Sequence, residues 1–349
     1  MLPWLGEQLI PVFGPFRLFT SFLFLAGTGA AFTAVVTWYL LPRLWSRLPT
    51  DQGRAYAVGA QQSVGKPVGA GLLFIPIYIL ACLLFIPFGV PFVAALGCVL
   101  LAALEGFLDD RTPGGWSEYA LGAIDLGISL IAALILCQLR PAVIWLPLVK
   151  TTLTLSPWIY VPSATAMIWL IINATNCTDG VDGLSGSLAA LAFLYLGGIL
   201  YGVVGHQDIS RYLLVPHYPD GASWGLMAFF MVGSLCGYLW HNAYPSAVLM
   251  GDAGSRPMGL LLGMLVLASG NPFMIFVVAG VALVNGALGL VKVALLRFLK
   301  IGIFSNVRYP LHDHVRHAQG WSNTQVMVRF VLLQVIGTPL LLILLFKVR

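Results

Sequence analysis

The segment from Asn173 to Gly186, NATNCTDGVDGLSG, decides how this chain is organised. It joins two apolar stretches and carries four polar side chains at every third position, with glycines between the later ones. These side chains are Asn173, Asn176, Asp179 and Asp182. Because a spacing of three drifts around a helix, we interpret the asparagines as the last turn of one helix. The aspartates then lie in a loop that opens the next helix, where free backbone N–H groups gather. The alternative is an ordinary polar loop in which Asp182 caps that helix.

The apolar content around this segment predicts an all-α integral membrane protein. Of the 349 residues, 59% are hydrophobic and 9% are charged, which leaves too little polar surface for a soluble globule. With about 20 apolar residues per span, we predict about ten transmembrane helices. No internal repeat is present, so residues 1–349 are expected to form a single domain. The predicted spans are 18–41, 72–88, 90–104, 120–138, 161–175, 184–204, 223–241, 257–269, 272–297 and 326–346.

The basic residues predict the orientation of these spans. If the loops after the odd-numbered spans face the cytoplasm, they hold eleven Lys and Arg, against six on the other side. Both termini are therefore expected to be periplasmic or extracellular. The formal net charge of +5 is attributed to topology and to anionic lipid or substrate, and no nucleic-acid binding is expected. The five cysteines form no CxxC pair and imply neither a disulfide nor a zinc site.

The acidic residues are distributed unevenly across the predicted membrane. Ten of the thirteen fall on or near the cytoplasmic side, where acids add nothing to orientation. The run EGFLDDRTPGG places Glu105, Asp109 and Asp110 at or just past the end of the third span. Neighbouring carboxylates there repel unless a cation lies between them or one stays protonated. A solvated helix end is the alternative. Asp252 follows in MGDAGS, a run that also describes a common turn.

Carboxylates at helix ends beside basic loops are what a magnesium and phosphate site requires. Lys66, in the Gly-rich run QQSVGKPVGAG, either helps to hold an anion or belongs to a flexible connector. The last inner loop carries His312, Asp313 and His314 between arginines, a composition better suited to phosphate than to metal. Asp125, in the second turn of the fourth span, is close enough to join the same inner rim.

On the opposite side, residues 139–160 alternate as in a short periplasmic hairpin.

Four segments, in this order and at these spacings, resemble one enzyme superfamily. They are GFLDD, NATNCTDGVDGLSG, MGDAGS and YPLHDHVRHAQGWSNTQVMVRF. They are similar to the polyprenyl-phosphate N-acetylhexosamine-1-phosphate transferases, and the last one favours the phospho-N-acetylmuramoyl-pentapeptide transferase branch (MraY). The resemblance spans nearly the whole chain. It implies a ten-helix homodimer of the bacterial inner membrane, Mg²⁺ as cofactor, a cytoplasmic active-site cleft and sensitivity to nucleoside-type inhibitors.

The reaction implied by this resemblance moves phospho-MurNAc-pentapeptide from UDP-MurNAc-pentapeptide to undecaprenyl phosphate. Its products are lipid I and UMP, in peptidoglycan biosynthesis. By motif position, Asp109 and Asp110 correspond to the catalytic pair, with Asp109 as base or phosphate-activating group, and Asp252 to the catalytic magnesium ligand. Substrate binding is implied for Lys66, Asn173, Asn176, Asp179, Asp182, Asn242, His312, Asp313 and His314. A single in-line displacement and a route through an aspartyl phosphate both stay open.

Several positions depart from the family pattern. The usual lysine of the first inner loop is replaced by Ser63, with Lys66 as the nearest substitute. The usual basic residue of the fourth span is replaced by Asp125. The other departures are Leu249 for an aromatic residue, Asp313 for a histidine and Arg256 for an apolar residue. We expect Arg256 to restore the cation and its loss to raise the Michaelis constant for the nucleotide substrate.

Two other functions compete with this interpretation. A related branch transfers GlcNAc-1-phosphate and would share the same aspartates, so UMP release from each UDP-sugar separates the two. An ion-coupled transporter would instead line a path at mid-bilayer with its acids, and would move substrate across liposomes without releasing UMP. The clustering of acids at one face favours the enzyme.

Overall fold

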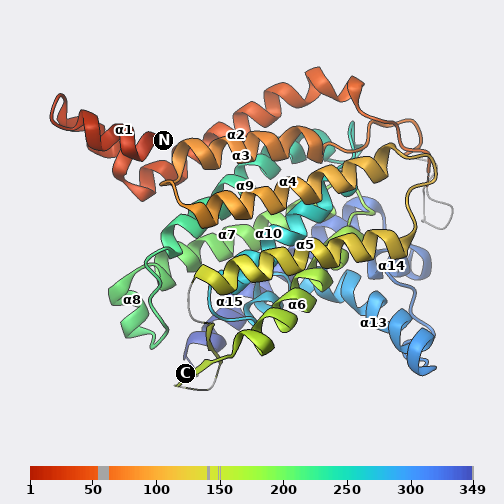
Figure 1. The fold of residues 1–349 in the computed structure, drawn as a ribbon. Coiled ribbons are helices and arrows are strands. Elements are labelled where there is room, and N and C mark those ends of the chain that lie inside the picture. The colour runs from red at the N-terminus through yellow and green to blue at the C-terminus, as the bar shows by residue number, and fades with distance from the viewer. Residues whose placement is uncertain (54–62, 140–141, 148, 150, 348–349) are drawn as a thin grey trace.

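The structure of the chain is a computed structural model that describes residues 1–53, 63–139, 142–147, 149 and 151–347. It is built from helices laid roughly side by side, with one short hairpin (Figure 1). The α-helices are α1 (Leu2–Leu9), α2 (Phe22–Leu44), α3 (Gly71–Phe85), α4 (Val90–Arg111), α5 (Glu118–Leu139), α6 (Pro157–Thr178), α7 (Leu184–Ile199), α8 (Gln207–Tyr212), α9 (Gly221–Asn242), α10 (Asp252–Ala268), α11 (Met274–Val278), α12 (Gly280–Ala282), α13 (Leu288–Ala294), α14 (Leu311–Gln319) and α15 (Asn323–Lys347). Short 3-10 helices cover Gly14–Thr20 and Trp45–Arg47, and π-helical turns cover Leu200–Val204, Leu283–Ala287 and Leu295–Leu299.

Eight helical segments of the described chain are long and apolar enough to cross a membrane. They are Phe22–Arg47, Val90–Arg111, Glu118–Gln138, Pro157–Thr178, Leu184–Val204, Gly221–Asn242, Gly280–Leu299 and Asn323–Phe346. The other two predicted spans coincide with α3, of 15 residues, and α10, of 17 residues, which are shorter than a usual span. The all-helical membrane architecture is thus confirmed, with eight candidate crossings.

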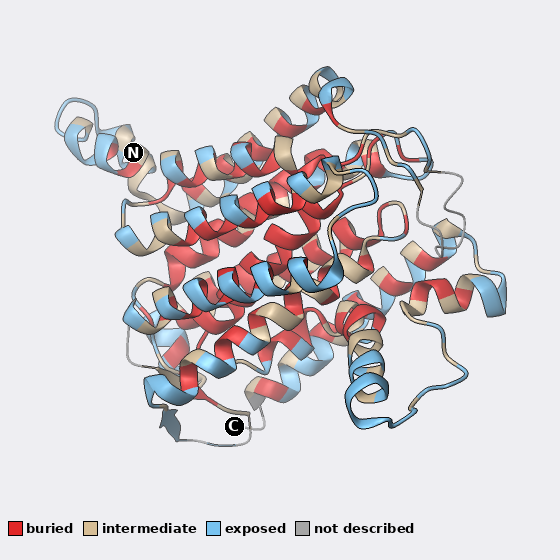
Figure 2. Cartoon of the chain, turned by 45° about the vertical axis from the view of Figure 1, so that its right-hand side comes forward, coloured by how far each residue is buried: buried red, intermediate tan, exposed pale blue. Residues whose placement is uncertain are grey.

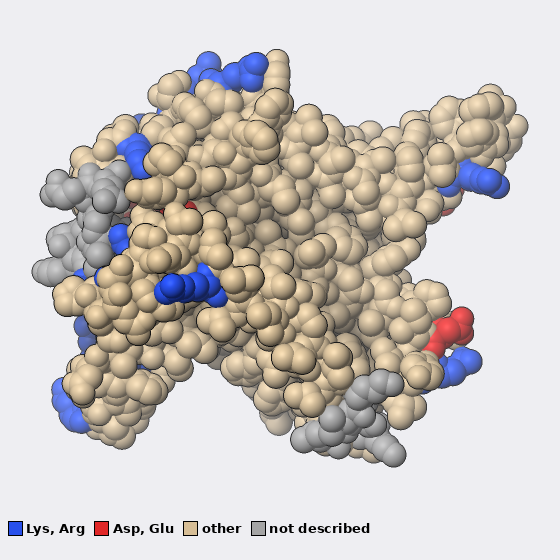
Figure 3. Space-filling model, turned by 180° about the vertical axis from the view of Figure 1, so that it is seen from behind, with Lys and Arg blue, Asp and Glu red and all other residues tan. Residues whose placement is uncertain are grey.

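The outer surface of the bundle suits contact with lipid. Large apolar side chains are exposed along α5 and α15, among them Leu130, Ile131, Ile336 and Leu340. In Figure 3 the middle of the visible face is almost free of charged side chains, and most of the Lys and Arg lie toward one end. A broad exposed apolar surface of this kind marks a protein that is not surrounded by water.

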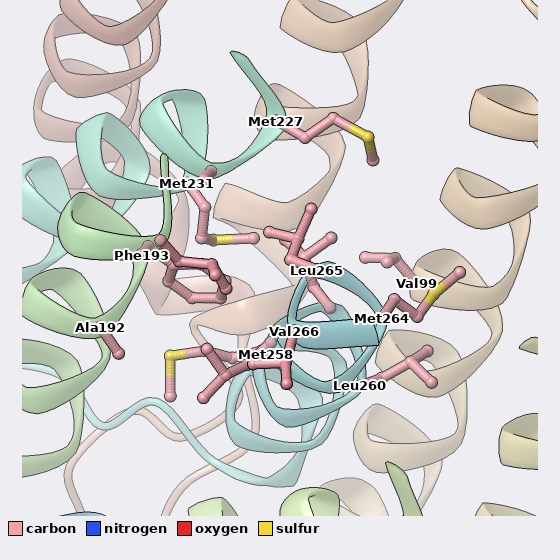
Figure 4. Close-up of a cluster of buried hydrophobic side chains, with 14 of the residues drawn as sticks. Val99, Ala192, Phe193, Met227, Met231, Met258, Leu260, Met264, Leu265 and Val266 are labelled. Atoms are coloured by element: carbon pink, nitrogen blue, oxygen red, sulfur yellow. The ribbon is translucent and has the colours of Figure 1, made fainter. Parts of the chain in front are cut away.

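Helix α10 forms the centre of the bundle. All 17 of its residues are buried, and it packs mainly against α4 and α6. Figure 2 shows this buried centre, and Figure 4 shows Met258, Met264 and Leu265 of α10 facing side chains of α4, α7 and α9. Gly259 makes the approach to α6 possible, because a Cβ there would lie 2.7 Å from the Ile172 Cα. Small residues at such contacts let membrane helices pack closely.

The pairing of α2 with α9 uses the same device. Gly233 and Gly237, four residues apart on α9, meet the carbonyl oxygens of Ala30 and Ala34, so that a Cβ would lie within 2.1 and 2.4 Å of them. The Thr33 hydroxyl donates a hydrogen bond across this contact to the Phe230 carbonyl at 2.9 Å.

The structure confirms the predicted hairpin and corrects several other predicted elements. The hairpin is confirmed: β1 (Val143–Trp145) pairs antiparallel with β2 (Thr152–Thr154). The ninth span, predicted as one helix over 272–297, is interrupted at Ala279: α11 precedes the break, and a continuous helical segment of α and π turns, Gly280–Leu299, follows it. Two predicted loops contain helices: α8 lies in the predicted outer loop, and α14 lies in the predicted last inner loop. Four basic residues used for the predicted orientation lie outside the described residues: Arg54, Arg140, Lys150 and Arg349.

Candidate active site

Three aspartates that are distant in sequence meet where α4 ends and α10 begins. Asp109 and Asp110 lie in the last turn of α4, and Asp252 is the first residue of α10. One carboxylate oxygen from each lies within 4.8 Å of the other two. Asp252 is buried, and the other two are half-buried. The predicted meeting of these acids is confirmed, and their hard oxygen ligands are the kind that Mg²⁺ prefers.

The N-terminus of α10 is held by a side chain from α4. Both oxygens of Asp110 accept backbone N–H groups there, one from Asp252 and one from Ala253, each at 3.0 Å. These are among the four donors that a helix start leaves without an intrahelical partner, and a negative charge is favoured at that end. The carboxylate of Asp110 therefore also fixes the position of Asp252. The sequence suggested a turn at Asp252, but with this cap the helix begins at that residue.

Gly251 makes the contact between α4 and α10 possible. Its φ of +70° lies in the region that L side chains rarely adopt. A Cβ at this position would lie 2.3 Å from Asp110 Oδ2 and 2.7 Å from the backbone nitrogen of Gly69. Gly106 of α4 also allows the two helices to pack closely, because a Cβ added at this position would lie 2.2 Å from the Asp252 carbonyl oxygen.

A buried arginine lies one turn behind Asp252. The Arg256 Nε donates to Asp252 Oδ2 at 2.8 Å, and its Nη1 lies 2.5 Å from Asp125 Oδ2. Asp125, which we predicted to join the inner rim, does adjoin the acid cluster through this arginine. Arg256 is only 4% exposed, so its partners are these carboxylates inside the protein.

The two asparagines of the opening segment lie on the last turns of α6, as predicted, and face this network. Asn173 donates to the Trp169 carbonyl at 2.9 Å and more weakly to Asp125 at 3.4 Å. Asn176 donates to the hydroxyl of Ser255 in the first turn of α10 at 3.3 Å. Asp179 is the C-cap residue, directly after the last residue of α6.

Asp182 has a different role from the one suggested by its position before α7. The N-cap of α7 is Gly183, at φ +77°, and no side chain caps that helix. Asp182 instead accepts the backbone N–H of Ser246 at 3.0 Å and its hydroxyl at 2.8 Å. Lys66 lies 3.8 Å from the same carboxylate and donates to the Ser246 hydroxyl at 3.0 Å. The interpretation of Asp182 as an N-cap was therefore wrong, because a loop from elsewhere in the chain supplies its partners.

Asn242 connects the loop before α7 to the loop before α10. Its side-chain oxygen accepts the Gly183 N–H, and its amide donates to the Val248 carbonyl, both at 2.8 Å. These bonds are buried, so both loops depend on one amide.

We expect Asn242→Ala to destabilise the protein, because it leaves the Gly183 N–H and the Val248 carbonyl buried without these partners. Each lost partner costs about 1–3 kcal/mol. Thermal unfolding in detergent measures the effect. Asn242→Asp keeps the acceptor for Gly183 but places a buried carboxylate beside the Val248 carbonyl, so its melting temperature should also lie below that of wild type. Equal melting temperatures for all three proteins would contradict this role.

The HDH run at residues 312–314 lies at the start of α14. Its first two residues are buried, and His314 is half-buried. His312 is buried; its backbone N–H donates to Asn285 Oδ1 at 2.8 Å, and its ring lies against Gly180. Asp313 is also buried and pairs with Arg316 at 3.4 Å. His314 Nδ1 accepts the Arg308 N–H at 3.4 Å. Among the described residues, the three clustered aspartates are the group of side chains that could hold a metal ion. The histidines of this run do not belong to that group.

Two residues of this site were missed in the sequence. Ser246 carried no signal, because a serine after proline describes any turn. Asn285 did carry one: it interrupts the apolar run VALVNGALGL, and a polar side chain inside a membrane span is a marker of function. It is fully buried in a π-helical turn and holds His312.

Comparison with known proteins agrees with this geometry. Residues 92–270, which include all three clustered aspartates, match the family model "Glycosyl transferase family 4". A phospho-N-acetylmuramoyl-pentapeptide-transferase of Treponema pallidum (strain Nichols) is 45% identical over 342 residues, which cover 97% of this chain and 94% of that protein. Proteins of the same name from Ruegeria pomeroyi and Helicobacter acinonychis are 33% and 27% identical, over 92% and 95% of this chain and 92% and 97% of their own lengths.

Proposed function

The chain belongs to the phospho-N-acetylmuramoyl-pentapeptide-transferase family, within glycosyl transferase family 4, and from this membership we propose how its residues carry out the transfer. It is a multi-pass membrane protein and a phospho-N-acetylmuramoyl-pentapeptide transferase. The donor is UDP-MurNAc-pentapeptide and the acceptor is undecaprenyl phosphate. The products are lipid I and UMP, in peptidoglycan biosynthesis.

One observation carries this proposal: Asp109, Asp110 and Asp252, from two helices, bring carboxylate oxygens within 4.8 Å of one another. So dense a set of negative charges at helix ends is costly unless a cation balances it. All the candidate ligands are carboxylate oxygens, which suits Mg²⁺. Each oxygen of Asp110 accepts one backbone N–H, and a carboxylate oxygen has two lone pairs, so this capping role is compatible with metal binding.

We assign Asp252, with Asp109 and Asp110, as the residues that hold Mg²⁺. The bound ion would withdraw charge from the donor diphosphate and stabilise the leaving UMP. An oxygen of the lipid phosphate attacks the phosphorus that carries MurNAc, and the bond from that phosphorus to the UMP oxygen breaks. A lipid phosphate is largely ionised near neutral pH, so Asp109 orients it and takes up whatever proton is left.

Asp109 is better placed than Asp110 to face the reacting groups. Both Asp110 oxygens already stabilise the start of α10 by accepting backbone N–H groups. Asp109 Oδ1 accepts the Trp116 N–H, at 2.5 Å, in the turn that follows α4. Asp110 therefore acts mainly by holding Asp252 in place. If the reaction proceeds through an aspartyl phosphate, we assign Asp109 as the nucleophile.

The loops beside the aspartates supply donors and a cation for the nucleotide. Lys66, held between Ser246 and Asp182, is a source of positive charge for the donor diphosphate. We assign the nucleotide-sugar site to these loops and to the adjoining ends of α6, α9 and α14. The residues assigned to it are Lys66, Asn173, Asn176, Asp179, Asp182, Asn242, His312, Asp313 and His314.

The same family membership and the charge distribution support a location for the protein. We propose a ten-helix homodimer of the bacterial inner membrane, with the active-site cleft facing the cytoplasm and both termini facing the periplasm. In support, α1 and the C-terminal part of α15 lie toward the same end of the bundle, away from the end of α4 and from α14 (Figure 1). The excess of Lys and Arg in the predicted inner loops supports the same orientation.

Substrate selectivity tests the proposed function. Full-length protein in detergent, with undecaprenyl phosphate and Mg²⁺, is expected to release UMP from UDP-MurNAc-pentapeptide and not from UDP-GlcNAc. Chelation of Mg²⁺ by EDTA should stop the release, and added Mg²⁺ should restore it. Mass spectrometry should identify lipid I as the second product.

Two outcomes would contradict this function. Faster UMP release from UDP-GlcNAc would place the chain in the sibling branch. Movement of substrate across liposomes without UMP release would indicate a transporter.

A further inference from the structure

Four charged side chains are buried together behind the acid cluster. Glu105 comes from α4, Asp125 from α5, and Asp252 and Arg256 from α10; none is more than 6% exposed. The guanidinium contacts all three acids. Its Nη1 lies 2.5 Å from Asp125 and 3.9 Å from Glu105, and its Nε lies 2.8 Å from Asp252. Among the described residues, Arg256 is the one cation that forms ion pairs with Glu105 and Asp125.

We propose that Arg256 is a positioning residue: it holds one carboxylate oxygen of Asp252, is itself anchored by Asp125, and weakens the affinity of the acid cluster for its divalent cation. This inference rests on the proposed function, because it concerns how the assigned metal ligand is presented. It gives Asp125 and Arg256 a role that neither would have as an isolated buried ion pair.

The guanidinium of Arg256 both holds Asp252 and is itself held by Asp125. Its planar fork contacts Asp252 through Nε and Asp125 through Nη1, so its orientation is fixed from both sides. A ligand carboxylate held by such a neighbour keeps one rotamer, which is how outer-shell residues orient metal ligands. Removing one partner of a buried pair is strongly destabilising, so the arginine and Asp125 are expected to depend on each other.

The charge of Arg256 has the opposite effect on metal affinity. A positive charge 2.8 Å from an oxygen of Asp252 opposes a second cation at that carboxylate. Asp125 offsets this effect only partly, because it lies on the far side of the guanidinium. The carboxyl of Glu105 contributes a weaker contact with the guanidinium at 3.9 Å. The arrangement therefore favours a well-oriented but exchangeable metal ion.

A set of four variants tests the proposal: Arg256→Met, Asp125→Asn, the double variant and Arg256→Lys. Full-length proteins in detergent are compared for melting temperature, for binding of Mn²⁺ by electron paramagnetic resonance without substrate, and for kcat at saturating Mg²⁺. Arg43→Met is the matched control, because Arg43 stacks on Tyr39 at the surface, remote from these acids.

The double variant is the decisive one. Arg256→Met alone leaves Asp125 buried without its cation and should unfold more easily, whereas the double variant removes both charges and should regain much of the melting temperature. Its kcat should nevertheless stay at least about tenfold below wild type, because Asp252 has lost its holder. Its Mn²⁺ dissociation constant should fall at least about threefold, because the nearest positive charge is gone. Arg256→Lys should keep a Mn²⁺ affinity close to wild type but a reduced kcat, because an ammonium retains the charge without the fork.

A double variant with kcat restored, or with Mn²⁺ binding no tighter than that of wild type, would overturn the proposal and leave Arg256 as a structural partner of Asp125. Asp252→Asn in the same Mn²⁺ titration separates this failure from failure of the proposed function. If wild type binds no Mn²⁺, or if Asp252→Asn binds it equally well, the assigned metal site is wrong. If Asp252→Asn loses Mn²⁺ binding while the double variant binds Mn²⁺ no more tightly than wild type, only the role of Arg256 is wrong.

Discussion

Replacing Asp252 with asparagine is expected to abolish most of the magnesium-dependent UMP release. The change removes a negative charge from the ligand at the start of α10 but preserves the size of the side chain. We expect kcat to fall at least about a hundredfold, since a bound metal supplies several kcal/mol of transition-state stabilisation and about 1.4 kcal/mol corresponds to a factor of ten. Raising the Mg²⁺ concentration should recover only part of this loss.

The matched control is Asp208→Asn, the same chemical change in the short helix α8 of the predicted outer loop, which should leave UMP release unchanged. Melting temperatures of both variants show whether either change acts through folding. The assignment of Asp252 would be lost if its asparagine variant kept wild-type activity at low Mg²⁺.

Gly251→Ala is expected to have the second largest effect, through the backbone. At φ +70° an alanine is strained, and its Cβ would collide with Asp110 and with the Gly69 nitrogen. Strain and overpacking each cost about 1–3 kcal/mol. Because the loop cannot relax without moving Asp110 away from the start of α10, both melting temperature and activity should fall together.

Gly97→Ala is the control for this change. Gly97 lies within α4, and a Cβ there would meet nothing within 4 Å. The same substitution should raise helix stability by roughly 0.5–1 kcal/mol. If Gly251→Ala were as well tolerated as Gly97→Ala, the close contact between α4 and α10 would not be essential.

Much of the fold follows from local patterns in the sequence. Apolar length predicted the eight long membrane helices approximately and the shorter α3 and α10, although the ninth predicted span is interrupted at Ala279. Alternation predicted the hairpin, because both signals depend on neighbours along the chain. The start of α10 could not be predicted in this way. Asp252 begins a helix because Asp110, 142 residues earlier, caps it.

In the candidate site, too, some features could be predicted from the sequence, whereas others depend on contacts between distant parts of the chain. Asp109, Asp110 and Asp252 were identified from charge placement and family resemblance, and their meeting is confirmed. The partners of Asp182 were not predictable, because Ser246 and Lys66 reach it from loops whose courses depend on the whole bundle. Arg256 was singled out as a departure from the family pattern. Its pairing with Asp125 required the packing of α5 against α10.

The complete burial of α10 separates Asp252 from the mechanics of the surrounding bilayer. Changes in bilayer thickness tilt or bend helices that touch lipid, such as α5 and α15, whose apolar faces are exposed. A helix enclosed by protein on every side is shielded from that force. Activity should therefore respond to membrane composition through delivery of the polyprenyl acceptor, while Asp252 keeps its position within the bundle in thin and thick membranes alike.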